Sequence, residues 1–124
     1  MASNLVGEVI NVDTGNWVRQ QAGIGAGIDS YYEYLLKAGV QLNSGELLDR
    51  FKIHYDSVEK YIFEDSGPLP LQVYMGKPHV NARTFTDALS AFWPGLQTFY
   101  GDVVRAAETH ELLYKASWKF GTFY

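Results

Sequence analysis

The sequence predicts an all-α fold of two helical hairpins, joined by short β-hairpin or strand-like connections. Apolar residues spaced three and four positions apart, the spacing of a helix face, occupy most of the chain. The same succession of elements also occurs twice, because the interval from Asp29 to Phe85 equals the interval from Gly45 to Gly101. The 124 residues are enough for one small domain.

The first predicted element is a short β-hairpin. The segment LVGEVINV (5–12) is rich in β-forming residues, and DTGN (13–16) has turn chemistry directly before Trp17 and Val18. A hairpin therefore precedes the first helix.

The first helix is predicted to begin at Asp29 or Ser30, either of which suits an N-cap, and to end near Leu42. Its apolar residues lie nearly all round the helix: Tyr31, Tyr32, Tyr34, Leu35, Leu36 and Val40. Such a helix is expected to be enclosed by neighbouring elements.

A second, amphipathic helix is predicted after the turn at 43–45, with its polar side facing outwards. Possible ion pairs on that side are Glu46 with Arg50 and Asp56 with Lys60. Its apolar stripe comprises Leu48, Phe51, Tyr55, Val58 and Ile62.

The connection that follows has strand-like alternation at Leu69, Leu71, Val73 and Met75, and its length suggests a functional loop. The second unit then begins with an apolar segment over 85–100, interrupted at Pro94 and Gly95, and continues after Gly101 with a helix capped by Asp102. The expected apolar stripe of this last helix comprises Val103, Ala106, Ala107, His110, Leu113, Tyr114, Ser117 and Trp118.

Two such units leave the flanks of their enclosed helices uncovered, because a helix that is apolar all round needs neighbours on both sides. The chain is therefore expected to be a fragment of a larger helical ring or array.

Composition excludes several classes of function. A net charge of −4 and scattered basic residues argue against nucleic acid as a partner. No apolar run approaches the roughly 20 residues that span a bilayer, so no membrane span is expected in this chain. With no cysteine there is no disulfide or thiolate chemistry, and the compartment stays open on composition alone.

Two motifs resemble known sites but have the wrong spacing. GIGAGID (23–29) has glycines at G-x-G-x-G, which does not match the dinucleotide-binding pattern. The glycines instead indicate a flexible approach of the backbone to a helix N-terminus, which could line a ligand cavity. His110-Glu111 lacks the second histidine of a zinc-binding H-E-x-x-H helix, because Tyr114 stands there, so His110 is interpreted as a core histidine. His54 and His79 are interpreted as surface or loop residues.

Three carboxylates are candidates for a functional role. Asp29 and Glu33 are four residues apart and so share a face of the first helix, and Asp87 lies in the second apolar segment. One interpretation is structural, with Asp29 as a helix cap and the others hydrogen-bonded to tyrosine hydroxyls. The other is a carbohydrate cleft, since sugars stack on aromatic rings and glycosidic cleavage requires carboxyl groups. The spacing leaves both open.

Three long motifs carry a resemblance to a known family: DTGNWVRQQAGIGAGIDSYYEYLLKA (13–38), NARTFTDALSAFWPGLQ (81–97) and GDVVRAAETHELLY (101–114). They resemble glycoside hydrolase family 47, the α-1,2-mannosidases, and within it the ER degradation-enhancing α-mannosidase-like branch. The resemblance implies that the two hairpins belong to an (α/α)7 barrel of seven. It also implies inverting removal of α-1,2-linked mannose from high-mannose N-glycans of misfolded glycoproteins in the endoplasmic reticulum, with Ca²⁺ as cofactor.

Residue by residue, the resemblance implies that Asp29, in the family's D-S-Y-Y-E-Y motif, is a catalytic carboxylate. Gly27 and Ala88 stand where the Golgi and ER processing branch often has a sugar-contacting arginine and histidine. Gly27, Glu33 and Asp87 are the candidate substrate-binding residues. The family's other acidic residues and its calcium-contacting threonine are expected outside this chain. The alternative function is a non-catalytic, lectin-like helical-repeat module that binds glycan without cleaving it.

Overall fold

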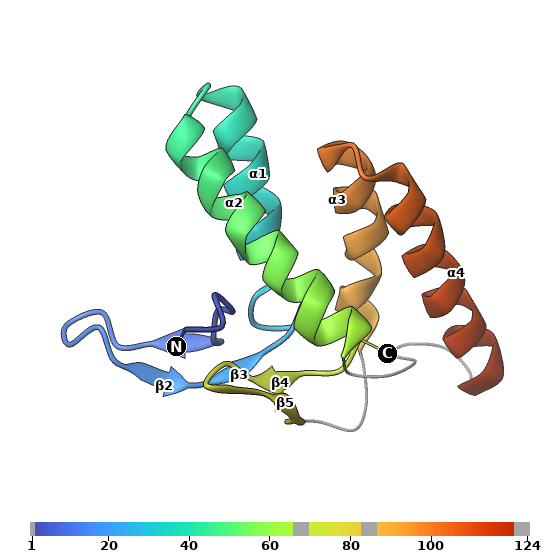
Figure 1. Cartoon of the computed structure of the whole chain (residues 1–124), viewed down its shortest axis with the longest axis horizontal. Coiled ribbons are helices and arrows are strands. Elements are labelled where there is room, and N and C mark those ends of the chain that lie inside the picture. Colours follow the sequence, from blue (N-terminus) through green and yellow to red (C-terminus); the bar gives the residue numbers. More distant parts are fainter. Residues whose placement is uncertain (1, 66–69, 83–86, 121–124) are drawn as a thin grey trace.

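The computed structural model describes residues 2–65, 70–82 and 87–120, and Figure 1 shows their arrangement. In chain order the elements are β1 (Val9–Ile10), β2 (Trp17–Arg19), β3 (Gln21–Ala22), α1 (Asp29–Gln41), α2 (Gly45–Val58), the π-helical η1 (Glu59–Glu64), β4 (Val73–Tyr74), β5 (Lys77–Asn81), the 3₁₀ helix η2 (Ala88–Phe92), α3 (Trp93–Tyr100) and α4 (Val103–Phe120). The described part of the chain is mostly helical, in agreement with the predicted class.

The predicted β-hairpin is confirmed. Strands β1 and β2 pair antiparallel, with Ile10 opposite Trp17. The Asn11 side chain accepts hydrogen bonds from the backbone N–H groups of Asp13 and Thr14, which closes the turn between the strands.

A second sheet joins segments that are far apart in the sequence. Its order is β3-β4-β5, and Gln21 in β3 lies opposite Tyr74 in β4. The predicted strand-like connection is thus a strand at Val73, whereas Leu69 lies outside the described residues. The connection after η1 is thereby tied to the segment that leads into α1.

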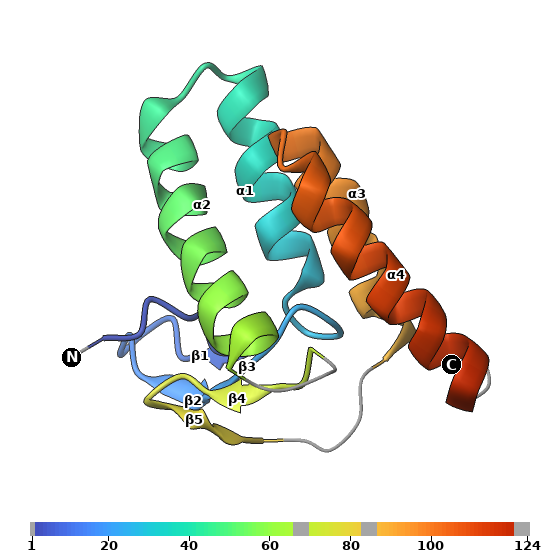
Figure 2. The same ribbon diagram turned by 45° about the vertical axis from the view of Figure 1, so that its right-hand side comes forward.

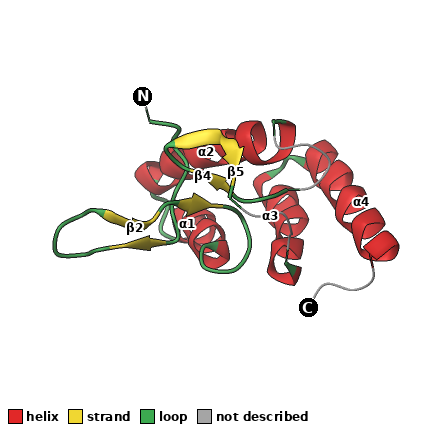
Figure 3. Cartoon of the chain, turned by 90° about the horizontal axis from the view of Figure 1, so that it is seen from below, coloured by secondary structure: helices red, strands yellow, loops and turns green. Residues whose placement is uncertain are grey.

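The helices form two hairpins, α1 with α2 and α3 with α4, and the sheets lie at one end of them (Figures 1 and 2). Both α1 and α3 begin at this sheet end, and the view from below in Figure 3 shows the strands there. The turn at 43–45 begins α2 as predicted, with the Ser44 side chain accepting from the Leu47 N–H.

The apolar stripe of α2 packs against α1 and α3, and Phe51, Tyr55 and Val58 are buried. The stripe continues into η1, where Ile62 is also buried. Of the predicted surface pairs, Glu46 with Arg50 is confirmed. The pairing of Asp56 with Lys60 is wrong, because Asp56 instead bonds Lys52 one turn earlier.

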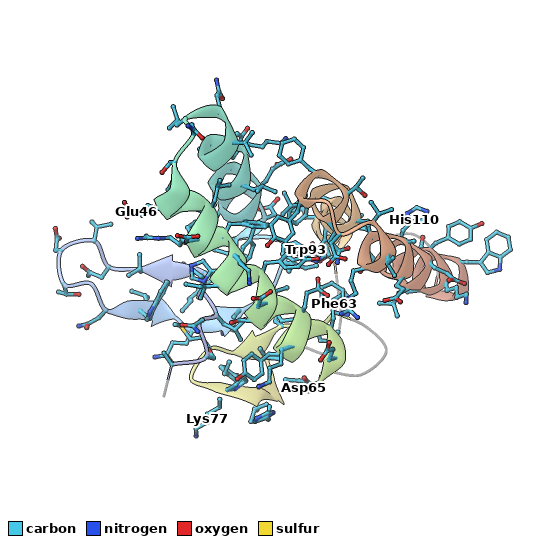
Figure 4. All side chains as sticks on the ribbon, turned by 45° about the horizontal axis from the view of Figure 1, so that its top comes forward. Glu46, Phe63, Asp65, Lys77, Trp93 and His110 are labelled. Carbon is cyan, nitrogen blue, oxygen red and sulfur yellow. The ribbon has the colours of Figure 1, made fainter. Side chains whose placement is uncertain are left out.

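Trp93 lies at the centre, between the two hairpins (Figure 4). Its ring is fully buried and packs edge-on against Tyr32 of α1 and stacks on Tyr55 of α2, with ring centroids 5.5 and 5.7 Å apart. The prediction that Pro94 interrupts this apolar segment is wrong. Pro94 stands in the first turn of α3, where proline needs no N–H partner, and the residues before it form η2.

A buried carboxylate connects the two hairpins. Oε1 of Glu59 accepts from the indole N–H of Trp93 at 3.0 Å and from Nε2 of Gln97 at 2.8 Å. Oε2 accepts from Nε and Nη2 of Arg105 at 3.1 and 2.6 Å. These bonds satisfy a charge that would otherwise be costly to bury, and they raise the pKa of the Arg105 guanidinium.

The enclosure predicted for the helices is only partial among the described residues. In α1, Tyr32, Leu35 and Leu36 are buried, whereas Tyr34 and Val40 are exposed. The reason is that α2 and α3 cover one side of α1, and no described element covers the other.

Helix α4 also buries only one face. Ala106 and Leu113 are buried as predicted, but Trp118 is 82 % exposed and Val103, Tyr114 and Ala107 are also exposed. His110 is exposed as well, so its interpretation as a core histidine is wrong. Figure 4 labels it on α4.

Candidate active site

Asp29 stands in the first turn of α1, at the end of the molecule where the sheets lie, and is half-buried. The prediction that Asp29 or Ser30 caps this helix is wrong. The N-cap is Ile28, and no side chain bonds the free N–H groups there. No hydrogen bond or ion pair engages the Asp29 carboxylate among the described residues. The helix macrodipole favours a negative charge at this position.

The turn before α1 is built around the peptide group that joins Gly25 to Ala26. The Gly25 carbonyl accepts from the backbone N–H groups of Asp29 and Ile28, at 3.0 and 3.3 Å. The Ala26 N–H of the same peptide group donates to Oδ2 of Asp87 at 3.3 Å. One peptide group therefore connects the Asp87 carboxylate to the backbone of Asp29.

Gly25 is required here by space. A Cβ at position 25 would lie 2.5 Å from Oδ2 and 2.6 Å from Oδ1 of Asp87, closer than real Cβ contacts. The glycine segment leads into the N-terminus of α1 as predicted, and the group that lies against its backbone at Gly25 is the carboxylate of Asp87.

A second close approach occurs two residues earlier. A Cβ at Gly23 would lie 2.6 Å from Cγ of Gln72, a buried residue that precedes β4. Nε2 of Gln72 donates to Oε1 of Glu8 in a short hydrogen bond. Glu8, with a side chain only 5 % exposed, also lies 3.8 Å from a guanidinium nitrogen of Arg19.

Gly27 has two structural reasons to be glycine. Its φ is +96°, a conformation that L-residues rarely adopt, and a Cβ there would lie 3.3 Å from Cγ and Cδ of Glu8. The buried Glu8 carboxylate therefore lies next to the loop that leads to Asp29. The sequence interpretation overlooked Glu8 and Gln72. A charged residue inside the β-rich run LVGEVINV was the available signal for Glu8.

Neither Glu33 nor Asp87 forms a hydrogen bond or ion pair with the Asp29 side chain. Glu33 forms an exposed i,i+4 pair with Lys37 at 3.0 Å. Asp87 caps η2 by accepting from the Leu89 N–H at 2.9 Å, directly before Ala88. The prediction of tyrosine hydroxyl partners for Glu33 and Asp87 is therefore wrong among the described contacts, because each carboxylate has a nearer donor. A sugar contact by either residue stays a prediction.

The aromatic motif after Asp29 is mainly structural. Tyr32 is fully buried, its hydroxyl has no hydrogen-bond partner among the described residues, and burial raises its pKa. Tyr31 bonds His54 at 3.2 Å, and Nδ1 of His54 donates to the Asn4 carbonyl at 2.7 Å. This chain of bonds ties the N-terminal segment to both helices of the first hairpin.

His54 and His79 lie near the surface as predicted. His54 is half-buried on α2, and the exposed His79 ring lies 3.8 Å from Asp65. Residues 2–65, 70–82 and 87–120 contain no group of three or more His, Asp or Glu side chains that could hold a metal ion. The expected calcium ligand stays a prediction for residues outside this chain. In the described part of the chain, no helix combines the length and hydropathy needed to cross a bilayer.

Comparison with known proteins gives a match along nearly the whole chain. The family described as glycosyl hydrolase family 47 matches residues 1–122. The chain is 57 % identical to human ER degradation-enhancing alpha-mannosidase-like protein 3 over 92 % of this chain and 12 % of that protein. It is 43 % identical to the human protein 2 of the same name over 93 % of this chain and 19 % of that protein.

A plant relative matches to a similar extent. The chain is 42 % identical to Alpha-mannosidase I MNS4 of Arabidopsis thaliana, over 95 % of this chain and 18 % of that protein. The chain therefore spans less than a fifth of the length of each of these three relatives.

Proposed function

The chain belongs to glycosyl hydrolase family 47, and from this premise we propose that it forms one wall of a mannosidase active site. The reaction proposed for the full-length protein is the inverting hydrolysis of α-1,2-linked mannose in high-mannose N-glycans. The names of the human relatives support a role in ER degradation, and the name of the plant relative supports mannosidase chemistry. The endoplasmic reticulum is the proposed site of action, with misfolded glycoproteins as the source of the glycans.

The observation that carries the proposal is the state of the Asp29 side chain. A carboxylate at the N-cap of a helix bonds the free N–H groups there, whereas Asp29 stands one residue further on and forms no such bond with the described residues. It is half-buried, and no residue that the structure describes bonds either of its oxygens. This arrangement is expected of a carboxylate that acts on a ligand, and it removes helix capping as the explanation of Asp29.

In the proposed mechanism, Asp29 either holds the proton for the leaving oxygen or orients the attacking water. Inversion requires a second carboxyl group on the opposite face of the sugar, about 6.5–9.5 Å away to leave room for water. That partner is proposed to come from residues outside this chain. Ca²⁺, when bound, would supply a charged anchor for sugar hydroxyls.

The two hairpins are proposed to be two of the seven in an (α/α)7 barrel. Support comes from the uncovered faces of the helices, which carry large apolar side chains: Tyr34 and Val40 on α1, Phe99 on α3, and Val103, Tyr114 and Trp118 on α4. Such faces are expected to bind further helices of the same domain. Asp29 then lies at the sheet end of the barrel, where α1 begins (Figure 1).

The experiment replaces Asp29 by asparagine in the full-length protein and measures single-turnover mannose release together with glycan affinity. Asparagine keeps the shape and removes the charge, so release should fall by about two or more orders of magnitude. Affinity should change little, because other residues make most sugar contacts. Asp56→Asn is the matched control, since Asp56 is an exposed aspartate bonded only to Lys52 among the described residues.

Two outcomes would contradict the proposal. Near-normal mannose release from well-folded Asp29→Asn protein would return Asp29 to a structural role. A wild-type protein that binds the glycan tightly but releases no mannose would establish the alternative, a glycan-binding module.

A further inference from the structure

Asp87 was a candidate for sugar binding, but its contacts indicate a different role. We propose that Asp87 is a positioning residue, which holds the catalytic Asp29 in place through the peptide group between Gly25 and Ala26. This inference rests on the proposed function only for its activity measurements, because its structural part can be tested in an inactive protein.

The first argument is that hydrogen bonds link the Asp87 carboxylate to the backbone of Asp29. Oδ2 of Asp87 accepts from the Ala26 N–H, and the carbonyl of the same peptide group accepts from the Asp29 N–H. A peptide group that donates to a carboxylate becomes a better acceptor at its carbonyl, because hydrogen bonds in a chain polarise one another. The carboxylate of Asp87 thus strengthens the hydrogen bond from the N–H of Asp29, the first residue of α1, to the Gly25 carbonyl.

The second argument is steric. The carboxylate occupies the space that a Cβ at position 25 would need, at 2.5 Å from Oδ2. Glycine at position 25 therefore allows Asp87 to reach the loop backbone. The side chain of Asp87 and the absence of one at Gly25 form a matched pair, next to a hydrogen bond that joins Ala26 and Asp87 across 61 residues of sequence.

The third argument is that Asp87 is itself held in place. Its other oxygen, Oδ1, accepts from the Leu89 N–H at the start of η2, and η2 leads directly into Trp93 at the centre of the fold. Asp87 therefore connects the second hairpin to the loop that leads to Asp29. A displacement of about 1 Å at a reacting group can cost a factor of about 100 in rate, so this connection is expected to affect turnover.

The principal test is Asp87→Asn in the full-length protein. Asparagine is as good an N-cap as aspartate but has one oxygen, so one of the two backbone donors loses its acceptor. The matched control is Ser44→Ala, which removes the side-chain cap of α2 without touching the loop. We expect kcat of Asp87→Asn to fall at least about tenfold while the glycan Kd stays within about threefold, and Ser44→Ala to change neither.

A second measurement is independent of activity. Hydrogen exchange of the backbone amides of Ala26 and Asp29 should be faster in Asp87→Asn than in the wild type and in Ser44→Ala. If the wild-type protein releases no mannose, the proposed reaction is refuted, yet the exchange rates still decide the positioning role. Unchanged exchange at both amides, or a kcat equal to that of Ser44→Ala, would overturn the inference.

The steric argument has its own test. Gly25→Ala should reduce kcat because the new Cβ collides with Asp87, and adding Asp87→Ala removes the collision. The double variant should then be no less active than Asp87→Ala alone. Losses that simply multiply would contradict the matched pair, because independent sites are additive in free energy.

Discussion

Introducing arginine at Gly27 tests whether this position affects the choice of mannose branch. In the full-length protein, Gly27→Arg introduces a guanidinium two residues before Asp29. The resemblance described above implies an arginine at this position in the Golgi and ER processing branch of the family. A charge-assisted hydrogen bond to a sugar hydroxyl is worth roughly 1.5–3 kcal/mol. Because about 1.4 kcal/mol corresponds to a factor of ten, the relative rates for two glycan isomers should change by about ten- to one-hundredfold.

The structure adds two costs to this substitution. The φ of +96° strains any L-residue by about 1–2 kcal/mol. The new Cβ would also lie 3.3 Å from Cγ and Cδ of Glu8, so this buried side chain must shift by a few tenths of an ångström. Gly27→Ala carries the same strain and the same contact without the charge. The difference between the arginine and alanine variants therefore isolates the guanidinium.

The assay measures the order in which isomeric mannoses are released by wild type, Gly27→Ala and Gly27→Arg. Strain alone lowers all rates together and leaves their ratios unchanged, so only the guanidinium should alter the ratios. Identical product patterns for the arginine and alanine variants would refute a specificity role for position 27.

Three further predictions concern the stability of the full-length protein and use thermal shift or denaturant unfolding. Glu59→Gln should destabilise it by about 1–3 kcal/mol, since buried donors lose an acceptor, and an unchanged midpoint would show that the Glu59 bonds contribute nothing. Gly39→Ala should destabilise the protein by about 1–3 kcal/mol, because its Cβ would lie 2.8 Å from Cδ2 of Leu48. Gly95→Ala, with open space around it, should be neutral or stabilising. Equal effects of the two substitutions would contradict the steric explanation. Stability should fall as pH rises above 10, because burial raises the pKa of Tyr32 in the folded protein and the unfolded chain loses this proton first. Tyr32→Phe should reduce the loss of stability at high pH. The same pH profile in wild type and Tyr32→Phe would argue against a contribution from Tyr32.

Local pattern was sufficient to predict most elements of the fold. The β-hairpin, the turn at 43–45 and the apolar stripe through Phe51, Tyr55 and Val58 all follow from periodicity and turn chemistry, which act between residues close in sequence. The family and the identity of Asp29 as the candidate catalytic residue likewise came from contiguous motifs, and the match over residues 1–122 confirms the family.

The sequence pattern did not predict side-chain partners that lie far along the chain, or which helix faces are covered. Asp102 directly precedes α4 as predicted, but the pattern gave no sign that its side chain accepts from the Tyr55 hydroxyl at 2.6 Å, a contact across 47 residues. His110 falls on an apolar stripe, yet it is exposed because the described neighbours of α4 cover only one of its faces. A stripe indicates which residues share a face of a helix, and the tertiary structure decides whether that face is covered.

The candidate site shows the same division. The sequence by itself determined that glycines precede an aspartate at the start of a helix, and that a second carboxylate follows in the other repeat. Only the tertiary structure decided that Asp29 caps nothing, that Asp87 occupies the space left by Gly25, and that the buried Glu8 lies beside Gly27. The physical reason is that a carboxylate takes the nearest available donor, and which donor is nearest depends on the packing of segments more than 60 residues apart in sequence.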